Sequence, residues 1–345
     1  MNERGWTDHA LVQLTLVRFR EFIREPEALF WVFLFPIILA AGLGIAFRNR
    51  PPEALRIVTP SPELAKALRG DKRLDVRLET EADAAQEMRT GKAVLEALPG
   101  QSDVTYRYDD TNPDGRTARM LADAAVQQAA GRVNPVKSDD SLVREPGSRY
   151  IDFLVPGLLG MNLMGSAIWG MGFAIVDARR KKLMKRLIAT PMPRRYYLMS
   201  FGLSRMVLLV LEVVVVLGFG AAAFGVPVRG PFIVLGGLCV LGSLSFSAIG
   251  LLIASRARTI EAASGLMNAV MMPMWVVSGV FFSSQRFPDV VQPIIKALPL
   301  TAAIDALRII MLQGGGLLQI APQIGVLGFW LVVGFSLALK LFRWK

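Results

Sequence analysis

The sequence predicts an all-α membrane bundle of six transmembrane helices, with a small α/β domain inserted after the first helix. Three observations predict this fold class. Hydrophobic residues make up 53% of the 345-residue chain, and its mean hydropathy is +0.43. Six apolar stretches are each twenty or more residues long. A polar interval, Arg48–Arg149, separates the first stretch from the other five.

The apolar stretches are long enough to cross a bilayer as helices. About 20 helical residues cover a hydrocarbon core of ~30 Å, and inside lipid the backbone must satisfy its own hydrogen bonds. The first stretch exceeds the apolar core of a signal peptide, which has about 7–15 residues, so we expect it to be retained. The six predicted spans are Pro26–Phe47, Ile151–Val176, Leu198–Phe224, Phe232–Ser255, Glu261–Phe282 and Ile320–Phe342.

Basic residues predict the orientation of these spans. Residues 177–197, here called the basic loop, hold eight Lys and Arg and a single acid, Asp177. Short loops this basic stay in the cytoplasm. We therefore expect a multi-pass protein of the cell (inner or plasma) membrane, with cytoplasmic termini and residues 48–150 extracytoplasmic. Arg48–Arg149 is neutral, with 17 Lys and Arg against 17 Asp and Glu. The net charge of +11 therefore comes from residues that border the apolar spans. That placement argues against nucleic acid as a partner.

The chain accordingly divides into four predicted regions. Residues 1–25 form a cytoplasmic interfacial helix, since Ala10–Glu25 mixes apolar and basic residues as membrane-surface helices do. Residues 26–47 form the first transmembrane helix and residues 48–150 the extracytoplasmic domain. Residues 151–345 form a five-helix transmembrane region that contains the basic loop. Membrane lipid is an expected partner of the interfacial helix, and a protein contact there stays open.

The polar interval alternates strand and helix patterns, which is typical of a layered α/β domain. Asp110–Gly115 has the composition of a turn, and Val133–Gly147 that of a linker. The acids of this turn lack the spacing and the final Glu of a calcium-binding EF-hand loop. The predicted strands are Arg56–Thr59, Leu74–Leu78, Ala93–Leu98 and Val104–Tyr108, and the predicted helices are Pro62–Arg69, Glu81–Thr90 and Arg116–Ala130.

Several kinds of chemistry are excluded by composition. The chain has one cysteine, Cys239, and one histidine, His9, so it offers no His/Cys metal site and no catalytic constellation. No G-x-x-x-x-G-K-[ST] sequence occurs in it. The chain therefore binds no ATP through a P-loop of its own, and we expect no metal and no cofactor on it.

The basic loop contains a short amphipathic pattern. Leu183 and Leu187 are four residues apart, and so are Met184 and Ile188, while Lys182 and Lys185 flank them. Such a helix can seat in a groove of a partner protein. A basic loop on anionic lipid headgroups explains the pattern equally well.

Three polar residues inside predicted spans are candidates for a functional role. Glu212 is placed mid-span among Leu and Val, and an ionisable residue at that depth should face the bundle interior, a cavity or a subunit interface. It is a candidate for a substrate pathway, with a structural role as the alternative. Asn162 and Asn268 are weaker candidates, because amides in spans also join helices to one another.

Several motifs, in order, resemble those of type-2 ABC exporter permeases with a large extracytoplasmic loop. They are Gly91–Pro99, Asp110–Pro113, Tyr150–Gly157, Ser278–Phe282, Phe287-Pro288, Leu298–Thr301 and Asp305–Arg308. The resemblance implies short non-spanning helices over Asp289–Leu312, broken at Pro299. It also maps a coupling helix onto Asp177–Leu187, although the family's Gly-Thr is missing there and its acids are replaced by bases.

The function that the resemblance implies is the membrane-spanning subunit of an ATP-driven exporter for a drug, small molecule or lipid-like substrate. Its partners would be cytoplasmic ABC ATPase subunits, which bind ATP and Mg²⁺, and a second permease copy or a paralogue. Leu183, Met184 and Leu187 would dock the ATPase, Lys182 and Lys185 would steer it, and Glu212 would line the pathway. The alternative is a membrane-anchored receptor or assembly factor with a ligand-binding outer domain. A membrane enzyme has no candidate acid–base residues.

Overall fold

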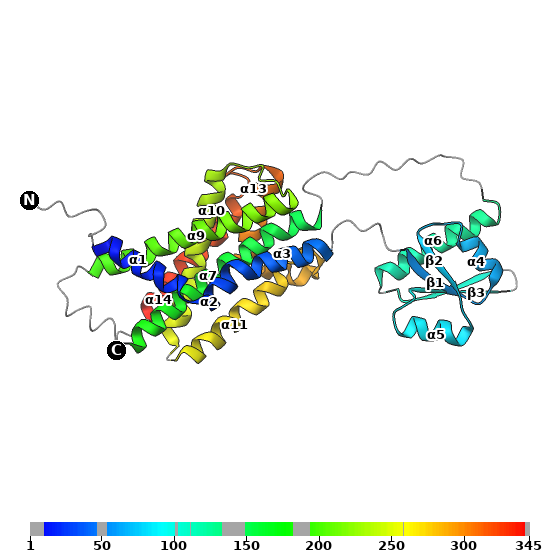
Figure 1. Cartoon of the computed structure of the whole chain (residues 1–345), viewed down its shortest axis with the longest axis horizontal. Helices are drawn as coiled ribbons and strands as arrows, with labels where there is room; N and C mark the ends of the chain where they lie inside the picture. Colours follow the sequence, from blue (N-terminus) through cyan, green and yellow to red (C-terminus); the bar gives the residue numbers. More distant parts are fainter. Residues whose placement is uncertain are drawn as a thin grey trace, which may run out of the picture. The chain divides into compact units, whose positions relative to one another are not determined.

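A computed structural model describes residues 10–46, 54–100, 103–110, 112–132, 149–181, 194–257 and 259–341 (Figure 1). The chain divides into two compact units. The helical unit comprises Met1–Arg48 and Val143–Lys345, and the α/β unit comprises Asn49–Leu142.

Six helices in the described part of the chain are long and apolar enough to cross a membrane, which confirms the predicted fold class. The first span, Pro26–Ala46, runs through α2 (Pro26–Leu29), the π-helix η2 (Phe30–Leu34) and α3 (Phe35–Ala46). The others lie in α7 (Tyr150–Arg180), α9 (Arg194–Phe224), α10 (Phe232–Arg256), α11 (Ile260–Val277) and α14 (Ala321–Leu341).

Helix α7 lies at the centre of the helical unit. In its most apolar window 83% of the residues are buried, against 17% of the residues in that of α14. It packs on α10, where small residues bring the two backbones together. A Cβ placed on Gly250 would stand 2.7 Å from the Ile168 carbonyl oxygen, so only glycine fits at this crossing.

The fifth span is shorter than predicted. Helix α11 ends at Val277 rather than at Phe282, because Gly279 adopts a positive φ of 82° that turns the chain out of the helix. Short helices follow before α14, as the resemblance implies: η3 (Ser284–Arg286), η4 (Asp289–Val291), α12 (Gln292–Ala297) and α13 (Pro299–Gln313). Pro299 separates the last two because it starts α13 at the first helical position.

The predicted interfacial helix is α1 (Ala10–Ile23), which packs against α9. The Arg18 side chain donates a hydrogen bond from Nε to Ser200 Oγ, 3.3 Å away. One face of α1 is therefore covered by protein. Leu16, Val17 and Ile23 remain exposed, as expected of a helix that also meets lipid.

The α/β unit is a four-stranded sheet with helices on both faces. Its strands are β1 (Leu55–Thr59), β2 (Leu74–Leu78), β3 (Leu95–Pro99) and β4 (Val104–Tyr108), in the order β2-β1-β3-β4. Strand β1 is parallel to β2 and β3, and β4 is antiparallel to β3. Helices α4 (Pro62–Leu68) and α6 (Pro113–Ala129) cover one face, and α5 (Glu81–Arg89) covers the other (Figure 1).

The helices of this unit begin where side chains cap them. Ser61, Thr80 and Asn112 each accept a backbone N–H of the first turn of α4, α5 and α6. Helix α6 therefore starts at Pro113, inside the segment predicted as a turn, because Asn112 and Pro113 suit the cap and the first helical position. The predicted linker Val133–Gly147 lies outside the described residues.

Candidate functional site

Four polar side chains meet inside the helical unit, and we call them the buried charge cluster: Ser166, Arg205, Glu212 and Ser243. Arg205 and Glu212 are seven residues apart on α9, so two helical turns bring them to the same side. Arg205 Nη1 lies 2.9 Å from Glu212 Oε1. Ser166 of α7 donates to Glu212 Oε2 over 2.8 Å. Arg205 also donates to Ser166 Oγ at 2.8 Å and to Ser243 Oγ of α10 at 3.1 Å.

The cluster keeps a carboxylate and a guanidinium away from solvent. The Glu212 side chain is 1% exposed and that of Arg205 15%. Removing two charges from water costs several kcal/mol each, so such a pair persists only where further hydrogen bonds satisfy it. Here α7 and α10 supply those bonds. The cluster thus joins three spans through one ion pair.

The sequence indicated Glu212 but not its partner. Arg205 lies inside the predicted span Leu198–Phe224, seven residues before Glu212, and a separation of two helical turns could have placed both on one side of the helix. The two serines could not have been found, because serine is common in spans without any charged neighbour. Whether Glu212 lines a pathway stays a prediction.

Asn162 of α7 is bonded to the first span. Its Nδ2 donates to the Val32 carbonyl oxygen over 3.0 Å. Pro36 has no N–H and cannot bond this carbonyl, which is four residues earlier. The π-helix η2 lies at the same place, as expected where a helical ladder is interrupted. Asn162 therefore compensates the interruption, and its pathway role stays a prediction.

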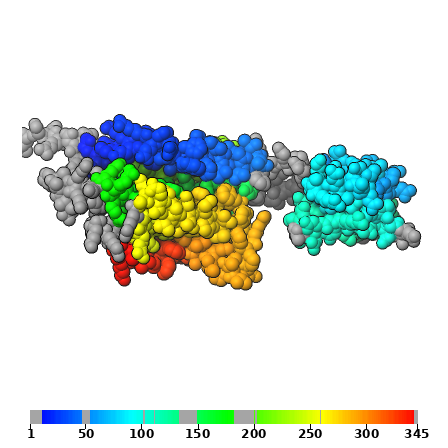
Figure 2. Space-filling view, turned by 90° about the horizontal axis from the view of Figure 1, so that it is seen from below, coloured from blue at the N-terminus to red at the C-terminus, as the bar shows by residue number. Residues whose placement is uncertain are grey.

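Asn268 of α11 has the opposite environment. Its side chain is exposed, while Met267 and Met271 on the same helix are buried. In Figure 2 the yellow residues of α11 lie on the surface of the helical unit. An amide on the outer face of a membrane span is unfavourable against lipid tails, so a face that carries one is a candidate for contact with protein or water.

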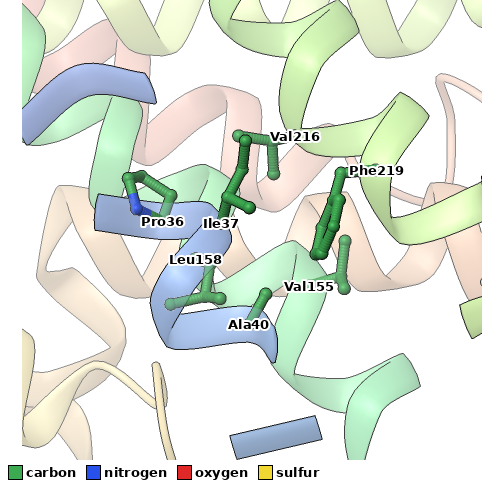
Figure 3. Close-up of a pocket in the computed structure, with 7 residues that line it drawn as sticks. All are labelled: Pro36, Ile37, Ala40, Val155, Leu158, Val216 and Phe219. Carbon is green, nitrogen blue, oxygen red and sulfur yellow. The ribbon is translucent and has the colours of Figure 1, made fainter. Parts of the chain in front are cut away.

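A small apolar pocket lies between the first span and its neighbours (Figure 3). Its lining has no charged or hydrogen-bonding side chain, and its volume of about 10 Å³ is too small for a substrate. Its lining comes from α3, α7 and α9: Pro36, Ile37, Ala40, Val155, Leu158, Val216 and Phe219.

The start of the basic loop is described, and the predicted ATPase contacts are not. Lys182, Leu183, Met184, Lys185 and Leu187 lie outside the described residues. Helix α7 extends past the predicted end at Val176, as far as Arg180. The helix end is stabilised by basic residues near its carbonyl groups and by an ion pair of 2.7 Å between Lys181 Nζ and Asp177 Oδ2.

Arg179 joins this end of α7 to α10. Its Nη1 donates to the carbonyl oxygens of Ala254 and Ala257, each at 3.3 Å. These carbonyls lie at the C-terminal end of α10, where backbone acceptors lack helical partners. A displacement of the basic loop would therefore act on two spans together.

Arg308 ties together the other end of the helical unit. Its guanidinium lies 3.5 Å from the centre of the Phe153 ring. It donates to the Phe153 carbonyl oxygen over 3.2 Å and also to that of Gly279. Helices α13 and α7 and the turn after α11 are thereby held at one point. The motif residues Asp305–Arg308 and Ser278–Phe282 include both ends of this contact.

The described residues contain no group of three or more His, Cys, Asp and Glu side chains arranged to hold a metal ion. Six apolar spans around a buried charge cluster define a multi-pass membrane protein. The chain belongs to the ABC-2 family of transporter proteins, whose family model matches residues 26–340.

Relatives of this chain come from distant organisms. It is 28% identical to ABC transporter G family member 20 of Dictyostelium discoideum, over 56% of this chain and 27% of that protein. It is 30% identical to the putative transport permease YvfS of Bacillus subtilis, over 40% of this chain and 56% of the relative. It is 25% identical to the inner membrane transport permease YadH of Escherichia coli, over 58% of this chain and 75% of the relative. The matched regions thus span about a quarter and about half of the first two relatives.

Proposed function

We propose that this chain is the membrane-spanning permease subunit of an ATP-driven ABC exporter. The observation that carries the proposal is the family match, which runs from the first span almost to the end of the last. Two relatives bear the word permease in their names. The chain itself has no P-loop sequence, so ATP and Mg²⁺ would bind to a separate ATPase subunit. The substrate would be a small molecule, a drug or a lipid-like compound.

The orientation follows from the basic residues. Residues 177–197 and both termini face the cytoplasm, and residues 48–150 face outward. The cell membrane is the expected location, and the name of the Escherichia coli relative, an inner membrane permease, supports it.

The basic loop would receive the force of ATP binding. Leu183, Met184 and Leu187 dock in the ATPase, and Lys182 and Lys185 guide it electrostatically. The contacts of Arg179 with α10 support this role, because a push on the end of α7 would reach both central spans. The two spans would then move as one body.

A second copy of the chain, or a paralogue, would complete the pathway. The exposed amide of Asn268 on α11 supports placing that partner along this helix, because the amide would then face protein or water instead of lipid. Glu212 and Asn162 lie deeper, and they would act on the pathway by holding the spans that line it.

The proposal is tested by purifying the full-length chain from its own membranes in mild detergent and identifying bound proteins by mass spectrometry. An ATPase with a P-loop is expected to co-purify. The double variant Leu183→Asp with Leu187→Asp should reduce the amount of co-purified ATPase at least about tenfold, since two charges enter an apolar contact. Leu78→Asp is the matched control, because Leu78 is an exposed leucine of the α/β unit.

The possible outcomes distinguish a failure of the permease assignment from a failure of the predicted docking residues. If no ATPase co-purifies with the unaltered chain under conditions that keep it folded, the permease assignment fails. If the double variant keeps its ATPase, the docking residues are wrong while the assignment stands. Tight binding of a ligand by the α/β unit, without any ATPase, would favour the receptor or assembly factor.

A further inference from the structure

A second pocket lies where the fifth span ends, and we call it the α11-end pocket. Val276, Phe282, Arg286 and Phe287 line it. Val276 is on the last turn of α11, and the other three follow the turn at Gly279. The rings of Phe282 and Phe287 lie 5.9 Å apart, tilted by 42°. One cation and three apolar side chains therefore surround the same space.

The loop that forms this pocket is held in place by hydrogen bonds. Gln292 Nε2 donates to the carbonyl oxygens of Ser284 and Phe287, both at 2.9 Å. Ser283 Oγ accepts the backbone N–H of Gln285 at 3.3 Å. A single glutamine thus fixes both ends of the segment that carries Arg286 and Phe287. The pocket is a feature of an ordered loop and is available before any ligand binds.

The guanidinium of Arg286 has no bonding partner within the described residues. Within the described part of the chain its side chain makes no hydrogen bond and no ion pair, although Asp289 is only three residues away. Arg308 shows the contrast, because its guanidinium is bound to two carbonyl oxygens and stacked on Phe153. A free guanidinium offers parallel donors that match a phosphate or carboxylate.

The surroundings indicate where the ligand comes from. Val276 is 57% exposed at the end of a membrane span, where hydrocarbon gives way to headgroups. Val290 and Ile294, on the short helices that follow, are exposed at 87% and 66%. Exposed apolar side chains at this level are expected to contact acyl chains. A ligand that meets both features needs an anionic head and an apolar tail.

We propose that the α11-end pocket binds an anionic phospholipid of the surrounding membrane. Arg286 holds the headgroup phosphate, and Val276, Phe282 and Phe287 pack against the first part of an acyl chain. The bound lipid would support the turn after α11, which Arg308 holds from the other side through Gly279. This site is separate from the proposed ATPase contacts and does not depend on the substrate.

The test uses the full-length protein in detergent, titrated with phosphatidylglycerol or phosphatidylcholine and observed by native mass spectrometry. Phosphatidylglycerol should bind at least about tenfold more tightly, because the choline ammonium of phosphatidylcholine neutralises the phosphate that both lipids carry and repels the Arg286 guanidinium. Arg286→Gln should remove that preference, because it weakens the binding of phosphatidylglycerol much more than that of phosphatidylcholine. Phe287→Ala should weaken the binding of both lipids. Lys296→Gln is the matched control, because Lys296 is an exposed cation on α12 that does not line the pocket.

Three results would overturn the proposal: equal affinity for the two lipids, full phosphatidylglycerol binding by Arg286→Gln, or an equal loss in Lys296→Gln. Displacement of the lipid by an equal concentration of glycerophosphoglycerol, the headgroup without tails, would also overturn it, since the site would then serve a soluble anion. An unchanged elution volume and helical circular dichroism show that each variant is folded.

Discussion

The two units of the chain carry ion pairs of similar length in opposite surroundings. In the α/β unit, Arg56 and Asp75 pair at 3.2 Å with side chains 35% and 40% exposed. In the helical unit, Arg205 and Glu212 pair at 2.9 Å with side chains 15% and 1% exposed. An exposed pair contributes about 0–1 kcal/mol because water competes for both charges. A buried pair is costly to break, since the remaining charge has no water. Position, more than distance, therefore decides what an ion pair does.

The largest effect is expected from breaking the buried pair. Glu212→Leu leaves Arg205 charged among apolar helices, and such a loss costs about 3–5 kcal/mol. Thermal unfolding of the purified protein in detergent measures it. Asp75→Leu, the control in the α/β unit, should cost less than about 1 kcal/mol.

The double variant Arg205→Leu with Glu212→Leu refines this prediction. It removes both charges and should recover most of the stability lost in the single variant, because no buried charge remains. If the single variant unfolds no more easily than Asp75→Leu, the contrast between the two units is wrong. A stable double variant that no longer transports would assign the pair a role in the pathway.

A smaller effect is expected where backbones touch. Gly250→Val places side-chain atoms against the Ile168 carbonyl, 2.7 Å from the position of a Cβ. Forcing extra atoms into packed helices costs about 1–3 kcal/mol. Gly236→Val on the same helix is the control, because no atom lies within 4 Å of its Cβ position. Equal melting temperatures for the two variants would show that α7 and α10 do not pack closely.

Uncharged hydrogen bonds should contribute similar amounts to the stability of the two units. Asn162→Leu frees the Val32 carbonyl in the first span, and bonds of this kind in membranes are worth about 0.6 kcal/mol, with a maximum near 1.7. Thr80→Ala removes the cap of α5, at a cost of about 1 kcal/mol. Thermal unfolding reports the first change, and hydrogen exchange of α5 reports the second. A loss of stability above about 3 kcal/mol for Asn162→Leu would contradict this prediction, because a neutral hydrogen bond would then matter as much as the buried ion pair.

The smallest effect depends on pH. A side-chain hydrogen bond from Arg73 lowers the pKa of Asp71 below its ordinary value. The folded state therefore favours the carboxylate, and this contribution is complete above the unfolded pKa of about 3.9 and lost as pH falls through the lower, folded value. Calorimetry of the α/β transition between about pH 5 and pH 2 should show less acid sensitivity in Asp71→Asn than in the unaltered chain. Identical profiles would mean that the pair contributes nothing.

The α/β unit was more predictable than the interior of the helical unit. Strands Leu74–Leu78 and Val104–Tyr108 match their predicted bounds, because alternation and turn residues act locally. The order β2-β1-β3-β4 depends on contacts between distant segments, which no local pattern encodes. The end of α11 depends on one glycine conformation, so composition placed it five residues too late.

In the helical unit, depth in a span identified Glu212 because a charge there is conspicuous. The buried charge cluster around it draws on three helices, and its contacts depend on how those helices cross. Arg286 was not singled out at all, since an exposed arginine in a loop is ordinary until the surrounding rings are placed. The sequence shows which residues can carry a charge or a hydrogen bond, but it does not show which of them the fold brings together.

Orientation is the most direct test of the account. In a Cys239→Ser background, Lys92→Cys and Arg180→Cys place single exposed thiols in the α/β unit and at the end of α7. A membrane-impermeant maleimide added to spheroplasts should label the thiol at position 92 at once, and the thiol at position 180 only after the membrane is opened. Labelling at position 180 in sealed spheroplasts, or protection of position 92, would contradict a permease that meets its ATPase at the basic loop.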